Sequence, residues 1–156
     1  MKQLLTLLLS AILGLTAMAQ KEQDFASRFM ALHPKEAALE CTTVSPVMME
    51  RMLQLPNVED DASLRQVLAQ LKSIRMVTCN EAAHAEKLFD DALKLARKNP
   101  KRYKLHAEEE HKKLYVRRRG KLIVEMVLFM VAESHFSLIN LTGNMNEKFL
   151  EQLMQL

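Results

Sequence analysis

Two cysteines, Cys41 and Cys79, are the first residues of this sequence whose chemistry can be anticipated. They are not in the C-x-x-C spacing of redox catalysts, and both fall in segments that we expect to be strands. A disulfide requires Cα atoms about 4.4–6.8 Å apart. Antiparallel neighbouring strands would let Cys41 and Cys79 meet, whereas parallel strands would hold them apart. The sequence leaves two alternatives open, a disulfide and a pair of buried thiols that act as small hydrophobes.

A second group with potential chemistry is the segment 106–111, HAEEEH, which holds two imidazoles and three carboxylates. Such groups bind divalent cations, but the segment lacks the H-E-x-x-H spacing and lies near a predicted hairpin turn rather than on a helix. A solvated polar turn is the better interpretation. We assign no metal ligand and no catalytic residue, because serine, histidine and aspartate are too dispersed for a triad. With three glycines in the chain, a phosphate-binding loop is excluded and no cofactor is expected.

The strongest anomaly of the sequence is its charge distribution. Residues 94–121 contain twelve Lys or Arg against three Glu, a net charge of +9, although the whole chain carries only +3. Six of these cations surround one predicted hairpin: Lys112, Lys113, Arg117, Arg118, Arg119 and Lys121. One function of such a cluster is to bind an anionic partner. Two alternatives are the protection of exposed strands against edge-to-edge pairing and cross-strand pairing with the glutamates at 108–110.

The N-terminal segment 1–19 has the three parts of a cleaved secretory signal in order. Lys2 is the positive start, residues 4–15 are apolar, and residues 17–19 read Ala-Met-Ala, which predicts cleavage before Gln20. The expected mature chain, 20–156, is a single soluble domain in the periplasm or outside the cell, with no transmembrane segment. The first cysteine is Cys41, so the lipid-anchoring cysteine of an envelope lipoprotein is not present after the signal. Export makes nucleic acid an unsuitable partner.

The periodicity of the apolar residues predicts the elements that position these side chains. Helices are expected at 23–32, from Ser45-Pro46 to Pro56, from the acidic loop 57–61 to about residue 72, at 81–98 with Asn80 as N-cap, and after Asn146. Strands are expected at 39–44, 74–79, 103–107, 113–118, 122–131 and 136–142, with Gly143 breaking the last. The fifth of these is apolar on both faces except at Glu125 and is therefore central.

This order of elements predicts an α+β fold in two layers. We expect about six strands in a mostly antiparallel sheet, a C-terminal four-strand meander, and helices packed mainly on one face.

Three stretches carry a resemblance to a known family: 42–53 (TTVSPVMMERML), 71–81 (LKSIRMVTCNE) and 136–150 (FSLINLTGNMNEKFL). They resemble the family catalogued as domain of unknown function 4252, small exported proteins typical of Bacteroidetes. The resemblance covers nearly all of the mature chain. It implies an exported α+β domain and no activity, and it supplies no functional residue. Many members look like lipoproteins, and this sequence departs from them at the signal.

The sequence thus favours an exported, envelope-associated binding or interaction domain over an enzyme. Its expected partner is an acidic protein or an anionic envelope component that contacts the basic hairpin. Two alternatives stay open. One is a hydrolase-like enzyme whose site forms only in three dimensions, and the other is a partner in envelope-stress signalling.

Overall fold

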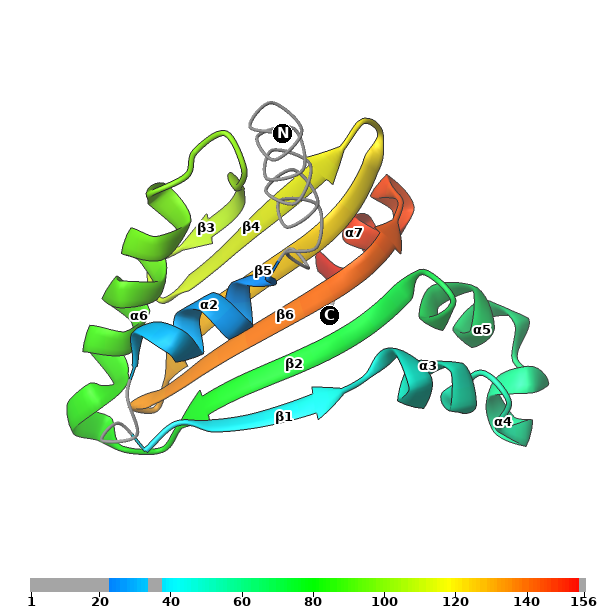
Figure 1. Cartoon of the computed structure of the whole chain (residues 1–156), viewed down its shortest axis with the longest axis horizontal. Helices are drawn as coiled ribbons and strands as arrows, with labels where there is room; N and C mark the ends of the chain where they lie inside the picture. The colour runs from blue at the N-terminus through cyan, green and yellow to red at the C-terminus, as the bar shows by residue number, and fades with distance from the viewer. Residues whose placement is uncertain (1–22, 34–37, 155–156) are drawn as a thin grey trace, which may run out of the picture.

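The computed structural model describes residues 23–33 and 38–154, so the expected signal segment lies outside the described residues. Within them, six strands form one antiparallel sheet in the order β1-β2-β6-β5-β4-β3 (Figure 1). The strands are β1 (Glu40–Val44), β2 (Leu71–Cys79), β3 (Lys104–Glu109), β4 (Lys112–Arg119), β5 (Leu122–Ala132) and β6 (His135–Met145). Strands β3 to β6 follow one another as a meander, which confirms the predicted α+β class and its C-terminal meander.

The helices are α2 (Phe25–Leu32), α3 (Pro46–Met52), α4 (Pro56–Glu59), α5 (Ala62–Leu68), α6 (Ala82–Arg97) and α7 (Glu147–Met154). Several of these helices have a short polar N-cap residue, whose side chain accepts a hydrogen bond from a free N–H group of the first turn. Ser45 accepts from Met48 N–H at 3.3 Å, and Asn146 accepts from Phe149 N–H at 2.9 Å, as the sequence predicts. Asn80 does not cap α6, because that helix begins after Glu81 without a side-chain cap.

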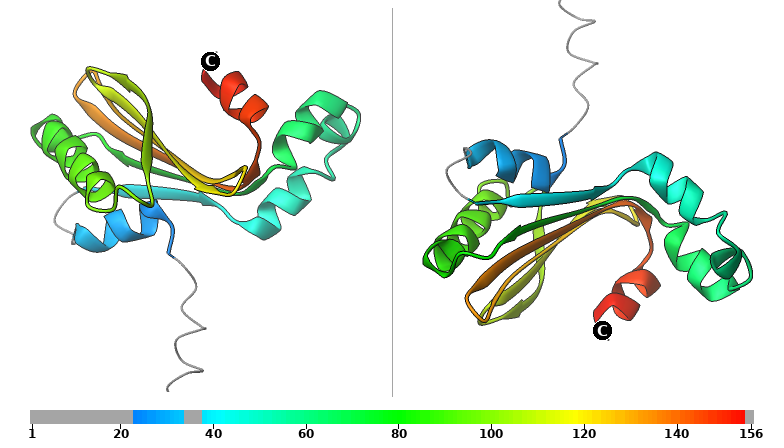
Figure 2. Two further views of the ribbon diagram at one scale, coloured as in Figure 1. Left: turned by 90° about the horizontal axis from the view of Figure 1, so that it is seen from above. Right: turned by 90° about the horizontal axis from the view of Figure 1, so that it is seen from below.

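Both faces of the sheet carry a buried apolar cluster. Helices α2 and α6 cover one face, where Phe25 and Phe29 are fully buried against aromatic rings of the sheet. Helix α7 covers part of the opposite face with Phe149 and Leu150. The remaining helices, α3 to α5, lie beyond one end of the sheet, far from α6 (Figures 1 and 2). Strand alternation divides the side chains of each central strand between these two clusters.

Two boundaries differ from the sequence prediction because of one close contact. Strand β2 begins at Leu71, within the segment expected to be helical, and β6 continues through Gly143, where it was expected to end. Leu71 and Gly143 are register partners. A Cβ at Gly143 would overlap the Gln70 carbonyl oxygen and lie 3.0 Å from Leu71 Cα. Gly143 therefore allows the two backbones to approach instead of ending the strand.

The strand expected at 103–107 also differs, because Tyr103, Leu105 and Ala107 do not share one face as regular alternation would place them. Tyr103 precedes β3 and is buried on the α2 side, whereas Leu105 is exposed. A β-bulge between Leu105 and Ala107 then shifts the register, and Ala107 packs with the cluster under α7. The bulge inserts a residue that local periodicity does not reveal.

Candidate functional site

The six cations of the predicted basic hairpin do not form one face. Lys113 and Arg117 lie on β4 on the same side as Tyr115, toward α2 and α6. Lys112 lines a pocket beside α7, and Arg118 contacts α7 itself, so these two lie on the opposite side. The division follows from the alternation of side chains along a strand. A hairpin rich in cations is thereby split between two surfaces.

Three of the six cations are neutralised by carboxylates. Lys113 Nζ donates to Glu108 Oε1 at 2.7 Å, and Arg117 Nε donates to Glu125 Oε2 at 2.8 Å. The Arg118 guanidinium forms a bidentate contact with the Glu147 carboxylate. The hydrogen bond from Lys113 lowers the pKa of Glu108, and that from Arg118 lowers the pKa of Glu147. Cross-strand and strand–helix pairing therefore accounts for at least these three cations of the hairpin cluster.

Cations without an ion pair gather where α6 ends and β3 begins. Arg97, Lys98, Lys101 and Lys104, here called the basic corner, are all exposed. None of them has a carboxylate within ion-pair distance among the described residues, although Arg97 helps to lower the pKa of Glu108. Arg102, in the same stretch, is held by Tyr103 and by the backbone carbonyl of Gln23. The basic corner was part of the cationic stretch 94–121 but not of the six hairpin residues.

A buried carboxylate is the most elaborate polar feature of the described chain. Glu125, on β5, is fully buried. Its Oε1 accepts from Phe25 N–H at 2.6 Å and from Asn140 Nδ2 at 3.1 Å. Its Oε2 accepts from the Tyr103 hydroxyl at 2.9 Å and from Arg117 Nε at 2.8 Å. Four donors thus compensate for the loss of hydration of one carboxylate.

This cluster fastens α2 to the sheet. Asn140 Oδ1 accepts from Ala26 N–H at 2.9 Å, so Glu125 and Asn140 satisfy two of the free N–H groups at the start of α2. A carboxylate at a helix N-terminus is also favoured by the helix dipole. Burial, and then the Glu125 charge, raise the pKa of Tyr103 to about 12. Tyr103 therefore remains a neutral donor, and the cluster has the contacts of a structural anchor. Sequence reasoning noticed Glu125 only as a charge within an apolar strand.

The two cysteines lie on adjacent antiparallel strands, the arrangement in which the sequence allows them to meet. Cys41 pairs in register with Val77, however, so Cys79 is two residues further along β2 on the same face. Diagonal neighbours of this kind have Cα atoms about 7–8 Å apart, beyond the usual range of a disulfide. Both are free thiols in the structure, Cys41 exposed and Cys79 buried. A disulfide between them stays one open alternative, whereas the alternative of two buried thiols holds for Cys79 and not for the exposed Cys41.

The HAEEEH segment does not assemble into a metal site in the described residues. Within residues 23–33 and 38–154, no three His, Cys, Asp or Glu side chains come together in a geometry that could hold a metal ion. His111 lies in the β3–β4 turn, 3.8 Å from Glu110 and 4.0 Å from Glu86. Glu108 points away from this turn group and binds Lys113.

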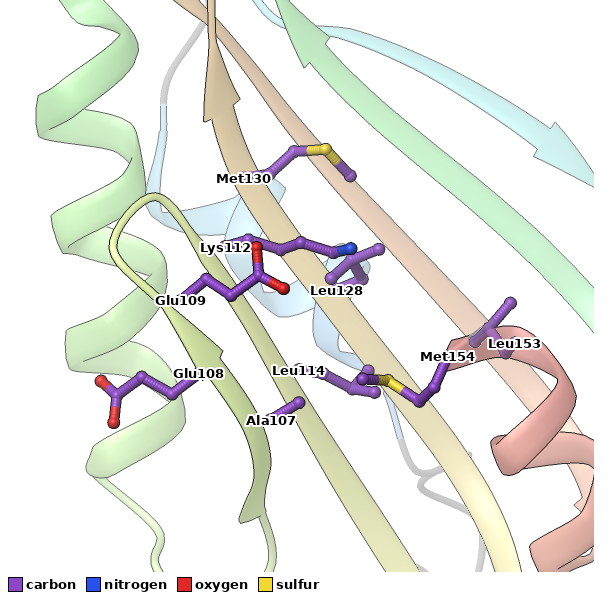
Figure 3. Close-up of a pocket in the computed structure, with 9 residues that line it drawn as sticks. All are labelled: Ala107, Glu108, Glu109, Lys112, Leu114, Leu128, Met130, Leu153 and Met154. Carbon is purple, nitrogen blue, oxygen red and sulfur yellow. The ribbon is translucent and has the colours of Figure 1, made fainter. Parts of the chain in front are cut away.

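A pocket of about 250 Å³ lies on the α7 face of the sheet, between the end of α7 and strands β3 to β5 (Figure 3). Its lining is mostly aliphatic or thioether: Ala107, Leu114, Leu128, Met130, Leu153 and Met154. Lys112, Glu108 and Glu109 also line it. The Lys112 side chain extends across the strands toward Leu128, whereas Glu108 points away toward α6 (Figure 3). No motif in the sequence indicated this pocket.

The comparisons with known proteins add a family match. Residues 37–153 match the model described as "Domain of unknown function (DUF4252)". No curated protein and no solved structure matches the chain. Helix α2 precedes the matched residues, whereas Glu125 and Asn140, which hold it, lie within them. None of the helices in the described residues has the length and apolar character that crossing a membrane requires.

Proposed function

The chain belongs to the DUF4252 family, and from the structure of this member we propose that it is an exported, envelope-associated binding domain for an anionic partner. The partner is an acidic protein surface or an anionic component of the envelope. The periplasmic or secreted location rests on the signal-like segment at 1–19.

This proposal rests on one observation. The cations of the basic corner have no carboxylate within ion-pair distance in the described residues, whereas three cations of the hairpin are paired with carboxylates. Lys98, Lys101 and Lys104 are exposed and lack an ion pair in the described chain. Their positive potential is therefore not cancelled locally and can act on an approaching anion. At 0.15 M salt this potential decays over about 8 Å, so the partner must come into near contact.

An acidic cluster lies at the opposite end of the molecule, near the exposed cations Arg51, Arg65 and Lys72. Glu59, Asp60 and Asp61 are exposed at α4 and at the start of α5. These helices lie at the far end of the sheet from α6 (Figure 1). Separated charges of this kind orient a protein as it approaches a charged surface, which raises the rate of productive encounters.

Two structural explanations compete for the same cations. Basic residues in the last turn of α6 are stabilised by the helix dipole, and this accounts for Arg97 and Lys98. Lysine on an edge strand discourages edge-to-edge pairing, and this accounts for Lys104 on β3. Neither requires a partner, so binding has to be measured directly.

The test compares two variants that lose the same charge at different places. The triple variant K98Q/K101Q/K104Q removes three lysines of the basic corner. The control R51Q/R65Q/K72Q removes three exposed cations near α3 to α5. The probes are immobilised polyglutamate, for an acidic protein, and phosphatidylglycerol vesicles, for an anionic envelope lipid.

We expect wild type and the control to bind at least one probe at low salt and to be released at 0.5 M NaCl. The basic-corner variant should bind at least fivefold more weakly. Equal weakening of both variants would mean that net charge alone is responsible, which contradicts the proposal. Retention of the wild type on neither probe would contradict it as well.

A further inference from the structure

The pocket beside α7 is a second feature that the proposed function does not use. It lies on the α7 face of the sheet, and none of its lining residues belongs to the basic corner. The inference drawn from it is therefore independent of the proposed function.

The lining determines what kind of molecule can be recognised. Six of the nine lining side chains are aliphatic or thioether, and none is aromatic. The pocket thus offers no ring for stacking against a nucleobase or sugar. Met130 and Met154 can adjust their flexible side chains to an irregular apolar shape. An aliphatic group is the chemistry that such a lining accommodates.

The apolar surface continues from the pocket across the sheet. Leu114 pairs in register with Leu128, Leu128 with Ile139, and Ile139 with Met76. These residues form one row across four neighbouring strands, roughly 14 Å from end to end at the usual strand spacing. At its far end Met76 is 42% exposed, and Ile139 is half-buried. The row suits an elongated apolar chain better than a compact one.

The rim of the pocket carries a cation without an ion pair. Glu108 is compensated by Lys113. Lys112 has no ion pair among the described residues, and its register partner Glu109 lies on the neighbouring strand. A ligand carboxylate would therefore be attracted by the Lys112 ammonium and repelled by the Glu109 carboxylate. Lys112 should therefore raise the affinity for an anionic ligand, and Glu109 should lower it.

We propose that this pocket binds a single-chain amphiphile with a terminal carboxylate, such as a free fatty acid. The alkyl chain lies against Leu114, Leu128 and the two methionines, and the carboxylate pairs with Lys112. The volume of about 250 Å³ is just below the 300–1,000 Å³ of typical ligand pockets, which favours one chain over a diacyl lipid.

Calorimetric titration of the mature protein with decanoate tests the proposal. Decanoate should bind, and octanoate should bind about fifteenfold more weakly, because each buried methylene contributes about 0.8 kcal/mol. K112Q should weaken decanoate binding by about two- to fivefold, and E109Q should strengthen it by a similar factor. Decylammonium, with the same chain and the opposite charge, should bind more weakly than decanoate.

A second pair of variants tests the location. Ala107→Phe fills the pocket and should weaken decanoate binding at least tenfold. Leu105→Phe, at an exposed position of the same strand outside the lining, should leave binding unchanged. The proposal is overturned if decanoate does not bind at millimolar concentration, or if A107F binds like wild type. It is also overturned if K112Q and E109Q change the affinity in the same direction. Circular dichroism of each variant confirms that it is folded.

Discussion

Replacing Glu125 with glutamine should destabilise this protein more than any exposed substitution of the same kind. The carboxylate accepts four hydrogen bonds, two on each oxygen, from Phe25, Asn140, Tyr103 and Arg117. A glutamine side chain has one acceptor oxygen, and its NH₂ group must face two of these donors. The Tyr103 hydroxyl can rotate to accept from the new amide, but Arg117 Nε cannot.

The magnitude follows from the burial of this site. Glu125 is fully buried, and Arg117 has a side chain only 16% exposed. Removing one partner of a buried ion pair typically costs about 3–5 kcal/mol, because the remaining charge stays buried. Single domains have a free energy of unfolding of about 5–15 kcal/mol, so E125Q should lose a large part of the total. The exposed control Glu151→Gln should change it by less than about 0.5 kcal/mol.

Urea denaturation of residues 20–156 at pH 7, followed by circular dichroism, measures the change in the free energy of unfolding for E125Q and for the Glu151→Gln control. Amide hydrogen exchange adds a local observation, because in E125Q the Phe25 N–H keeps at best a neutral amide oxygen in place of the Glu125 carboxylate. Exchange at Phe25 and Ala26 should accelerate before exchange in α6 does. A free energy of unfolding within 1 kcal/mol of wild type would refute the argument that Glu125 anchors α2.

Two further predictions concern Gly143 and Tyr103. Gly143→Ala should reduce the free energy of unfolding by at least about 2 kcal/mol in urea denaturation, because its Cβ would overlap the Gln70 carbonyl oxygen. The control Gly120→Asn, at a positive φ with open space around it, should leave the free energy of unfolding nearly unchanged. Equal effects of the two substitutions would contradict this reasoning. The pKa of Tyr103 is raised from 10.0 to about 12 by burial and by Glu125, so its stabilisation is complete below pH 10 and is lost as the pH rises toward 12. Wild type should lose about 2–3 kcal/mol more than Tyr103→Phe across this interval, and parallel pH profiles would contradict the assignment.

Much of the fold is predictable because periodicity reports burial directly. The apolar spacing of α6 and the caps at Ser45 and Asn146 are local signals, and the structure confirms them. The start of β2 is not local. Leu71 continues the helical spacing of the preceding residues, but its pairing with Gly143 makes it a strand residue. Tertiary pairing here overrides a local pattern.

The candidate sites depend even more on distant contacts. A run of cations predicts a basic surface only if no carboxylate from elsewhere reaches it. Arg118 is neutralised by Glu147, 29 residues away, and Glu125 binds the backbone of Phe25, 100 residues away. Neither pairing can be predicted from the residues that neighbour its members in the sequence. The basic corner keeps its charge because none of its residues has a carboxylate within ion-pair distance in the described residues.

The most direct test of the proposed binding function is affinity capture from envelope extract with three immobilised proteins, each comprising residues 20–156. These are wild type, the basic-corner variant K98Q/K101Q/K104Q and the equally charged control R51Q/R65Q/K72Q. We expect wild type and control to retain the same acidic protein or anionic lipid at low salt and to release it at 0.5 M NaCl, while the basic-corner variant does not retain it. Retention of that partner by all three proteins, or by none, would contradict a binding role of the basic corner.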